Sequence, residues 1–344
     1  MQLFEEINTL LSGQKPFVCY VKPNESLWNL QVQQTNEIIA FSGQSGFVFV
    51  TFDAGIKVCI PNEISTFSQG NFENLEQKLA DSFTSEDNQK DAFENLVSKG
   101  IAAIQKGAFD KVVLSRKIVL KEQIALVATF QNLIATYPTA FRYLFFHPKI
   151  GLWMGATPEQ LVTINQNQFE TVALAGTQLF SESIIWTTKE IEEQQFVTDF
   201  IVSEIASKVE NLVVSEPKTI KAGNLAHLKS VISGQLTADF TGLDLITHLH
   251  PTPAVCGFPK ESALDFILNN EAFTRTYYSG FLGEYNSNNQ TDLFVNLRCL
   301  EVENNVVNIY VGCGITKDSN PEMEFLETEN KSMTMRNIIV FSGQ

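Results

Sequence analysis

The order of the strand-like segments limits the possible folds of this chain more than any other feature. Short runs rich in Val, Ile and Phe follow one another across Gly- and Asn-containing turns, and helical segments are grouped instead of following every strand. Two series stand out, at residues 142–146, 151–155, 160–164 and 169–175, and at 275–285, 292–301 and 306–312. Parallel strands need a long crossover each time, so this order predicts the α+β class with antiparallel sheets.

The remaining elements follow from hydrophobic periodicity. Further strands are predicted at 16–21, 36–42, 46–52, 55–60, 112–119, 211–220 and 228–235. Helices are predicted at 3–11, 71–105 with an acidic break at 85–87, 125–136, 188–209, 243–249, 260–270 and from Pro321 onward. The length of 344 residues suggests about two domains, but no linker-like segment divides the chain.

Composition argues against several kinds of partner. The net charge of −15 is unfavourable for binding nucleic acid or an anionic membrane surface. No apolar run reaches the roughly 18 residues of a membrane span, and the acidic N-terminus lacks the basic region of a signal peptide. The cysteines are odd in number and never in a CxxC spacing, which predicts reduced thiols in a cytoplasmic protein and neither disulfides nor zinc. They are Cys19, Cys59, Cys256, Cys299 and Cys313.

The stretch from the last predicted strand into the final helix has the composition of half a binding site. The strand 306–311 leads through Gly312 and Gly314 to a helix that Asn320 caps and Pro321 begins. Glycine allows close approach to its backbone amide, which suits an anionic ligand. The stretch is therefore a candidate anion site beside an acidic helix.

Two predicted helices carry the pattern Glu-x-x-Glu. In the final helix, Glu324, Glu327 and Lys331 share one face, and the alternative is a surface helix with an ordinary Glu327–Lys331 ion pair. In the helix that begins near residue 188, Glu193 continues the apolar stripe and so needs a partner, while Glu190 lies one turn earlier. The alternative for Glu190 is a capping box. Together the two pairs favour a Mg²⁺ site, because Mg²⁺ takes few carboxylates and keeps water or ligand oxygens.

Lys111 and Glu159 are candidates for proton transfer. Alternation in KVVLSRK places Lys111 and Val113 on one face, where burial would lower the pKa of the lysine and make it a base. Glu159 follows a turn between apolar strands, where a carboxyl can have a raised pKa and donate a proton. For each residue, a solvated strand end or turn is the simpler alternative.

Arg298 and two histidines complete the candidates. Alternation in LFVNLRCLEV places Arg298 on one face with Asn296, and a guanidinium there fits a bound carboxylate. His227 and His250 are candidate site residues, although a histidine with a structural role in the core or in a turn is the commoner outcome for each. The sequence contains no GxGxxG, Walker A, GxSxG or HExxH pattern, so nucleotide, serine-hydrolase and zincin sites have no support.

Several of these segments, in this order, resemble the chorismate-utilising enzymes. The segments are KVVLSR, MGATPEQL, ALAGT, the first Glu-x-x-Glu helix, AHL, LHPTPAVCGFP, YYSGFLGE, NLRCLEV and VGCGI…PEMEFLETENKS. The resemblance is specific over residues 95–340 and loose over 1–90. Within the family the chain looks most like an isochorismate synthase, which implies one large α+β domain over residues 1–344, with a β-sandwich core surrounded by helices.

The resemblance also implies roles for individual residues. Lys111 would be the base that activates water for attack at ring carbon C2 of chorismate, and Glu159 the acid that protonates the departing C4 hydroxyl. Mg²⁺ would bind Glu193 and Glu327 directly, with Glu190 and Glu324 nearby, through water, and would hold the ring carboxylate. The residues assigned to substrate binding are Gly176, Thr177, His227, Ala254, Arg298, Gly312, Gly314 and Lys331.

The subtype depends on fewer residues. Aminating relatives carry Gln at the position of Lys111 and Thr at that of Ala254, so this chain favours water over ammonia as the nucleophile. Gln194 and Gln195 depart from the family pattern beside the metal helix. The alternatives are a salicylate synthase, an aminating enzyme and a non-catalytic chorismate-binding relative. The family suggests a monomer, and the product could serve menaquinone or siderophore biosynthesis.

Overall fold

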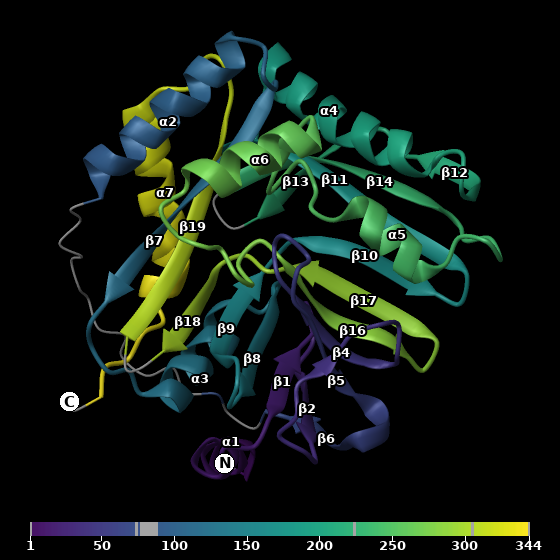
Figure 1. Ribbon diagram of the computed structural model, residues 1–344, viewed down its shortest axis with the longest axis vertical. Helices are drawn as coiled ribbons and strands as arrows, with labels where there is room; N and C mark the ends of the chain where they lie inside the picture. The colour runs from purple at the N-terminus through teal and green to yellow at the C-terminus, as the bar shows by residue number, and fades with distance from the viewer. Residues whose placement is uncertain (1, 73–74, 76–88, 223–224, 304–305, 343–344) are drawn as a thin grey trace.

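Two large antiparallel sheets pack face to face in the computed structural model, and helices cover their outer faces (Figure 1). The structure describes residues 2–72, 75, 89–222, 225–303 and 306–342. All strand pairs in these ranges are antiparallel, and the chain forms a single domain. The α+β class and the sandwich architecture are therefore confirmed.

The first sheet contains the strands that carry Lys111 and the glycine pair. In spatial order it consists of β15 (Gly257–Phe258), β7 (Lys111–Leu120), β19 (Val306–Ile315), β18 (Cys299–Glu303), β9 (Gly151–Thr157), β8 (Phe141–His147), β1 (Phe17–Val21), β2 (Leu27–Gln33) and β6 (Ser65–Asn71).

The second sheet carries His227 and the residues beside Glu159. Its order is β12 (Glu210–Val214), β14 (Leu225–Gln235), β11 (Gln168–Leu179), β10 (Gln160–Asn165), β17 (Gln290–Val295), β16 (Phe281–Ser287), β4 (Gly46–Val50), β5 (Lys57–Pro61) and β3 (Ile39–Ala40), and β13 (Lys218–Ala222) also pairs with β14.

Three groups of helices cover the sandwich. The helices α1 (Gln2–Ser12) and α3 (Leu126–Thr136) pack on the outer face of the first sheet, and α4 (Thr188–Ile205) and α5 (Gly242–Leu249) pack on that of the second. Around β7 and β19 lie α2 (Lys90–Gln105), α6 (Lys260–Asn270) and α7 (Pro321–Arg336) (Figure 1). The 3₁₀ turn η1 (Asn62–Ile64) precedes β6. None of the helices in the described ranges is long and apolar enough to cross a membrane.

Strand β8 shows why sequence alternation was weak in the core. Its residues Tyr143 and Phe145 point into the layer between the sheets, whereas Leu144 and Phe146 point toward α1 and α3. Both faces are covered, so all seven residues are buried and apolar residues occupy both faces.

Several predicted boundaries were wrong. The strands β2 and β6 were not predicted. The sequence of β6, STFSQGN, is largely polar, whereas that of β2, LWNLQVQ, alternates apolar and polar residues and was overlooked. The predicted strand at 36–42 is only the two residues of β3, and 211–220 is two strands separated by Pro217, which lacks an amide donor. The helix predicted from residue 71 begins, where described, at Lys90; residues 73–74 and 76–88 lie outside the described ranges.

The most consequential error concerns the predicted strand 292–301. The chain leaves the second sheet after β17 and enters the first sheet at β18, and Arg298 in the crossing has a φ of 48°. The side chain of Asn296 fixes this crossing, accepting from the Tyr143 hydroxyl at 2.7 Å and donating to the Tyr277 carbonyl at 3.0 Å. Arg298 therefore does not alternate along one strand. The predicted strand 275–285 is a strand only from Phe281 onward. Residues 275–280 form a turn whose backbone bonds to Asn296 in the crossing segment.

Candidate active site

A cavity of about 310 Å³ opens between the two sheets and the first turns of α4 and α7. All predicted site residues except Thr177 line it: Lys111, Glu159, Gly176, Glu190, Glu193, His227, Ala254, Arg298, Gly312, Gly314, Glu324, Glu327 and Lys331. Thr177 is described by its backbone, which pairs with His227 across β11 and β14. Residues more than 200 positions apart in the sequence thus meet at one cavity.

Lys111 reaches the cavity from the first position of β7. Burial lowers the pKa of its ammonium group, and the negative charge of Glu193 opposes that effect. A Cβ atom on Gly314 would lie 3.1 Å from the Lys111 Cε atom, so the glycine leaves room for the lysine tail. Both features show a desolvated ammonium group, and the role of Lys111 as a base stays a prediction.

Glu159 lies at the turn between β9 and β10. Its carbonyl accepts from the amide of Val295, and its amide donates to the Thr157 hydroxyl at 3.3 Å. Burial raises the pKa of the Glu159 carboxyl to about 7, although three nearby cations oppose the shift. Such a carboxyl is partly protonated at neutral pH and can donate a proton.

The backbone amides of Gly312 and Gly314 point away from β7. On β7, the amides of Val113 and Ser115 point away from β19. The Val113 amide donates to the Cys256 carbonyl, and the Ser115 amide donates to the Glu271 carboxylate. In an antiparallel pair, the backbone amides of two directly opposed residues either both point toward the partner strand or both point away from it. Gly314 opposes Val113 and Gly312 opposes Ser115, so both amides point outward, beyond the end of the pairing with β18. Two amides are thus available at the cavity for an anion.

Arg298 and Lys331 add two cations beside these amides. One terminal nitrogen of Arg298 donates to the Lys331 carbonyl at 3.1 Å and to the Thr334 hydroxyl at 3.2 Å. The Lys331 ammonium donates to the Gly312 carbonyl at 3.0 Å. Burial lowers the pKa of Arg298. An anionic group between these residues would replace the water that such a buried cation lacks.

Two acidic residues of α7, Glu324 and Glu327, are candidate metal ligands. Asn320 caps the helix by accepting from the amide of Met323 at 3.1 Å, as predicted. Glu324 and Glu327 line the cavity, and Glu327 pairs with Lys331 at 2.7 Å. The alternative considered from the sequence, an i,i+4 ion pair, is therefore present together with the cavity location.

The acidic residues of α4 differ from each other. Glu190 forms the capping box with Thr187 and accepts from the Gln178 amide at 3.0 Å; burial would raise the pKa of Glu190, but these hydrogen bonds lower it. Glu193 is half-buried in line with Val197, a core residue, and faces Lys111. Glu190 thus has a structural role as part of the helix cap, whereas the Glu193 side chain is directed at the cavity.

Gly176 brings the start of α4 close to His227. It has a φ of 70° and forms a bulge in β11, and a Cβ atom there would lie 3.0 Å from that of Glu190. Burial lowers the pKa of His227, and a hydrogen bond to the Gly176 backbone opposes the shift. His250, in contrast, bonds to the Phe52 carbonyl at 2.9 Å away from the cavity and is a core histidine.

The two glutamines beside Glu193 have different surroundings. Gln194 is buried and donates to the hydroxyls of Thr198 and Ser230, at 2.9 and 2.8 Å, which attaches α4 to β14. Gln195 is exposed and donates to Asp199. The departure from the family pattern at Gln194 is therefore accommodated by a hydrogen-bonded core position.

The donors at the cavity are chemically suited to Mg²⁺. Glu193, Glu324 and Glu327 offer hard oxygen ligands, and a bound anion and water would complete an octahedron. Within the described ranges, no three His, Cys, Asp or Glu side chains lie close enough together to hold a metal by themselves. The metal role of the four glutamates stays a prediction.

Some cavity residues were not singled out from the sequence. Tyr278, Ser279, Leu297 and Tyr310 also line the cavity, and Tyr278 stacks on Tyr310 with ring centroids 5.4 Å apart. The segment YYSGFLGE, which contains Tyr278, contributed to the family resemblance, but no residue in it stood out by type or spacing.

The class of protein follows from comparison with known families, which agrees with a β-sandwich whose two sheets enclose a cavity lined by a lysine, an arginine and a buried carboxyl. The chain belongs to the family described as chorismate binding enzyme, whose profile matches residues 53–340. The expected resemblance is confirmed.

The similar proteins include isochorismate synthases. Isochorismate synthase DhbC of Bacillus subtilis is 31% identical over 264 residues, which are 71% of this chain and 66% of that protein. Isochorismate synthase EntC of Escherichia coli is 29% identical over 263 residues, 73% of this chain and 67% of that protein. The matches thus span about two thirds of the relatives' length. The structure of MenF, the menaquinone-specific isochorismate synthase from Escherichia coli, shares the fold, with a TM-score of 0.79 at 20% identity over 94% of this chain and 88% of that one.

Proposed function

We propose that this protein is a Mg²⁺-dependent isochorismate synthase that converts chorismate to isochorismate. The observation that carries the proposal is the placement of Lys111, on β7, and Glu159, at the turn between β9 and β10, at one cavity. The pKa of the lysine is lowered there, and that of the carboxyl is raised to about 7. A base and an acid with displaced pKa values are what paired proton transfer at one ring requires.

In the proposed reaction, Lys111 removes a proton from water as its oxygen bonds to ring carbon C2. The ring double bonds shift, the C4–O bond breaks, and Glu159 gives its proton to the departing hydroxyl, which leaves as water. Arg298, Lys331 and the amides of Gly312 and Gly314 hold the carboxylate of the enolpyruvyl group. Mg²⁺, when bound by the glutamates of α4 and α7, would screen and orient the ring carboxylate.

The nucleophile and the pathway are parts of the same proposal. Lys111 and Ala254 favour water over ammonia, as expected from the resemblance. The similar isochorismate synthases include a menaquinone-specific one and a vibriobactin-specific one. Genomic neighbours would separate the menaquinone from the siderophore pathway.

A product assay tests the proposal. Purified protein with chorismate and Mg²⁺ should form isochorismate, detected by chromatography, and EDTA should abolish the reaction. Lys111→Ala and Glu159→Ala should each lower the rate by roughly 10²- to 10⁴-fold. Salicylate with pyruvate as products would indicate a salicylate synthase, and an aminated product in the presence of ammonia would indicate an aminating enzyme. Thermal stabilisation by chorismate without turnover would indicate a binding protein.

A further inference from the structure

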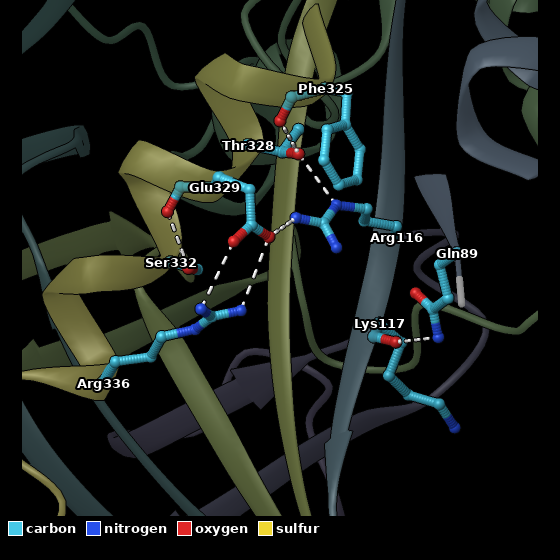
Figure 2. Close-up of polar contacts among 8 residues, drawn as sticks. All are labelled: Gln89, Arg116, Lys117, Phe325, Thr328, Glu329, Ser332 and Arg336. Carbon is cyan, nitrogen blue, oxygen red and sulfur yellow. Dashed lines mark hydrogen bonds and ion pairs between the residues drawn. The ribbon is translucent and has the colours of Figure 1, made fainter. Parts of the chain in front are cut away.

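A buried ionic network lies on the face of β7 opposite the cavity. It consists of Arg116, Phe325, Thr328, Glu329 and Arg336, here called the Arg116 network, and Figure 2 shows its members between β7 and α7. Arg116 Nε donates to the Thr328 hydroxyl at 2.8 Å, and a terminal nitrogen pairs with Glu329. The guanidinium lies 4.5 Å from the centroid of the Phe325 ring, and Arg336 pairs with Glu329 at 3.3 Å.

The network and the cavity occupy opposite faces of the same strand. Lys111 and Val113 line the cavity, whereas Val112 and Leu114 pack with Phe325 in the core on the other side. Since side chains alternate along a strand, Arg116 belongs to the second face. None of the proposed catalytic steps uses Arg116, although it is buried and charged.

The helix α7 is attached to the sheet from two sides. On the cavity side, Arg298 donates to the Lys331 carbonyl and to the Thr334 hydroxyl, near the end of the helix. On the opposite side, Arg116 contacts the middle of the helix, at the fully buried Thr328 and at Glu329. Glu324 and Glu327 lie in the first half of α7, directly before Thr328.

Helix geometry connects these contacts to the cavity. Residues one apart on a helix differ by about 100° in direction, so Thr328 directed at Arg116 determines where Glu327 points. Thr328 cannot turn freely, because its hydroxyl also donates to the Phe325 carbonyl at 2.7 Å. The planar, forked guanidinium group of Arg116 contacts both Thr328 and Glu329 and therefore limits rotation of the helix about its axis.

We propose that Arg116 is a positioning residue, which through Thr328 and Glu329 fixes the rotation of the first half of α7 and so directs Glu324 and Glu327 into the cavity. The inference rests on the proposed function, because it assigns those glutamates to the Mg²⁺ site. It predicts that the two attachments of α7 serve different ligands. The Arg116 side serves the metal, and the Arg298 side serves chorismate.

Two threonines of α7 offer a matched test. Thr328→Val removes the hydroxyl that accepts from Arg116 Nε, with little change in volume, and Thr334→Val removes the hydroxyl that accepts from Arg298. We expect Thr328→Val to raise the Mg²⁺ concentration for half-maximal rate by roughly tenfold, with the chorismate KM at saturating Mg²⁺ changed by less than about twofold. Thr334→Val should show the reverse pattern. Thr328→Ser, which restores the hydroxyl, should recover most of the Mg²⁺ response.

Mg²⁺ binding is also measured without turnover. Calorimetric titration of Mg²⁺ into Lys111→Ala protein holding chorismate should give a Kd that the added Thr328→Val change raises by roughly the same tenfold factor. Arg116→Lys keeps the charge and loses the fork, and should act in the same direction. It provides the test if Thr328→Val does not fold, as judged by thermal unfolding.

The outcomes separate the two proposals. If wild-type protein forms isochorismate with Mg²⁺, but Thr328→Val and Arg116→Lys leave the Mg²⁺ midpoint and Kd unchanged, the positioning role is wrong and the proposed function stands. The role is equally wrong if both threonine variants raise the chorismate KM alone. If wild-type protein neither turns over chorismate nor binds Mg²⁺, both proposals fail.

Discussion

Glu159 illustrates how one side chain couples function to stability. Its pKa is about 7 in the folded protein against an ordinary value of 4.5, because burial disfavours the charged form. Between these values the folded state binds more protons than the unfolded state, so its contribution to stability is present at low pH and is lost as pH rises through about 7. The group suited to donate a proton therefore destabilises the free enzyme at alkaline pH.

Glu159→Gln should remove this cost while abolishing activity. We expect the variant to be more stable than wild type by about 1 to 3 kcal/mol near pH 8 and to be nearly equal to it near pH 4. Urea unfolding at the two pH values measures the difference, and Glu210→Gln on the exposed start of β12 is the control. A variant that loses stability equally at both pH values would contradict the burial argument.

At the residue level, sequence reasoning named Lys111 and Glu159 as candidates for shifted pKa values, although a solvated strand end or turn was the simpler alternative for each. Burial in the fold lowers the pKa of Lys111 and raises that of Glu159, which local sequence could not decide. Sequence reasoning misjudged the backbone of Arg298, whose positive φ depends on a crossing between sheets. Tyr278 was missed because a tyrosine in an apolar run has no signal that separates core from cavity.

The element that matters most for the site is α7, and its start depends on one cap. Asn320 satisfies a backbone amide of the first turn, four residues before Glu324. Asn320→Ala should lower the free energy of unfolding by about 1 kcal/mol and should also raise the Mg²⁺ requirement, because the first turn carries Glu324.

A second cap provides the control for this prediction. Thr241 caps α5 by accepting from the amide of Asp244, away from the cavity. Thr241→Ala should cost a similar amount of stability in urea unfolding with unchanged isochorismate formation. Equal losses of activity in the two variants would mean that the effect of Asn320 is general instability.

Elements were predicted well where capping or a single covered face gives a local signal. The start of α7, and α1, α3, α5 and α6 within one or two residues, followed from caps and 3.6-residue periodicity. The strands were harder, because both faces of the first sheet are covered and alternation disappears. The edge strand β6 has no apolar run and was missed altogether.

On the scale of the whole molecule, one buried ion pair joins segments from three parts of the chain. Arg275 donates to the carbonyls of Val255 and Val113, and Glu271 accepts from the amide and hydroxyl of Ser115. The pair is separated by 2.5 Å, with both side chains 2% exposed. It attaches β7, and thus Lys111, to the turn that follows α6.

Breaking this pair should destabilise the whole fold. Glu271→Ala leaves a buried arginine without its partner and should lower the free energy of unfolding by about 3 to 5 kcal/mol. The double variant Glu271→Leu with Arg275→Met removes both charges and should lose less than the single variant. Thermal and urea unfolding measure both effects, and a double variant less stable than Glu271→Ala would contradict this account.

Taken by itself, the sequence determined the class of fold, the capped helices and the chemical types available for the site, because these depend on local periodicity, capping and charge. Only the tertiary structure decided that the chain crosses between sheets at Arg298, that the amides of Gly312 and Gly314 point outward, and that α7 is attached from two sides. Those features depend on contacts between residues far apart in the chain, for which no local pattern exists.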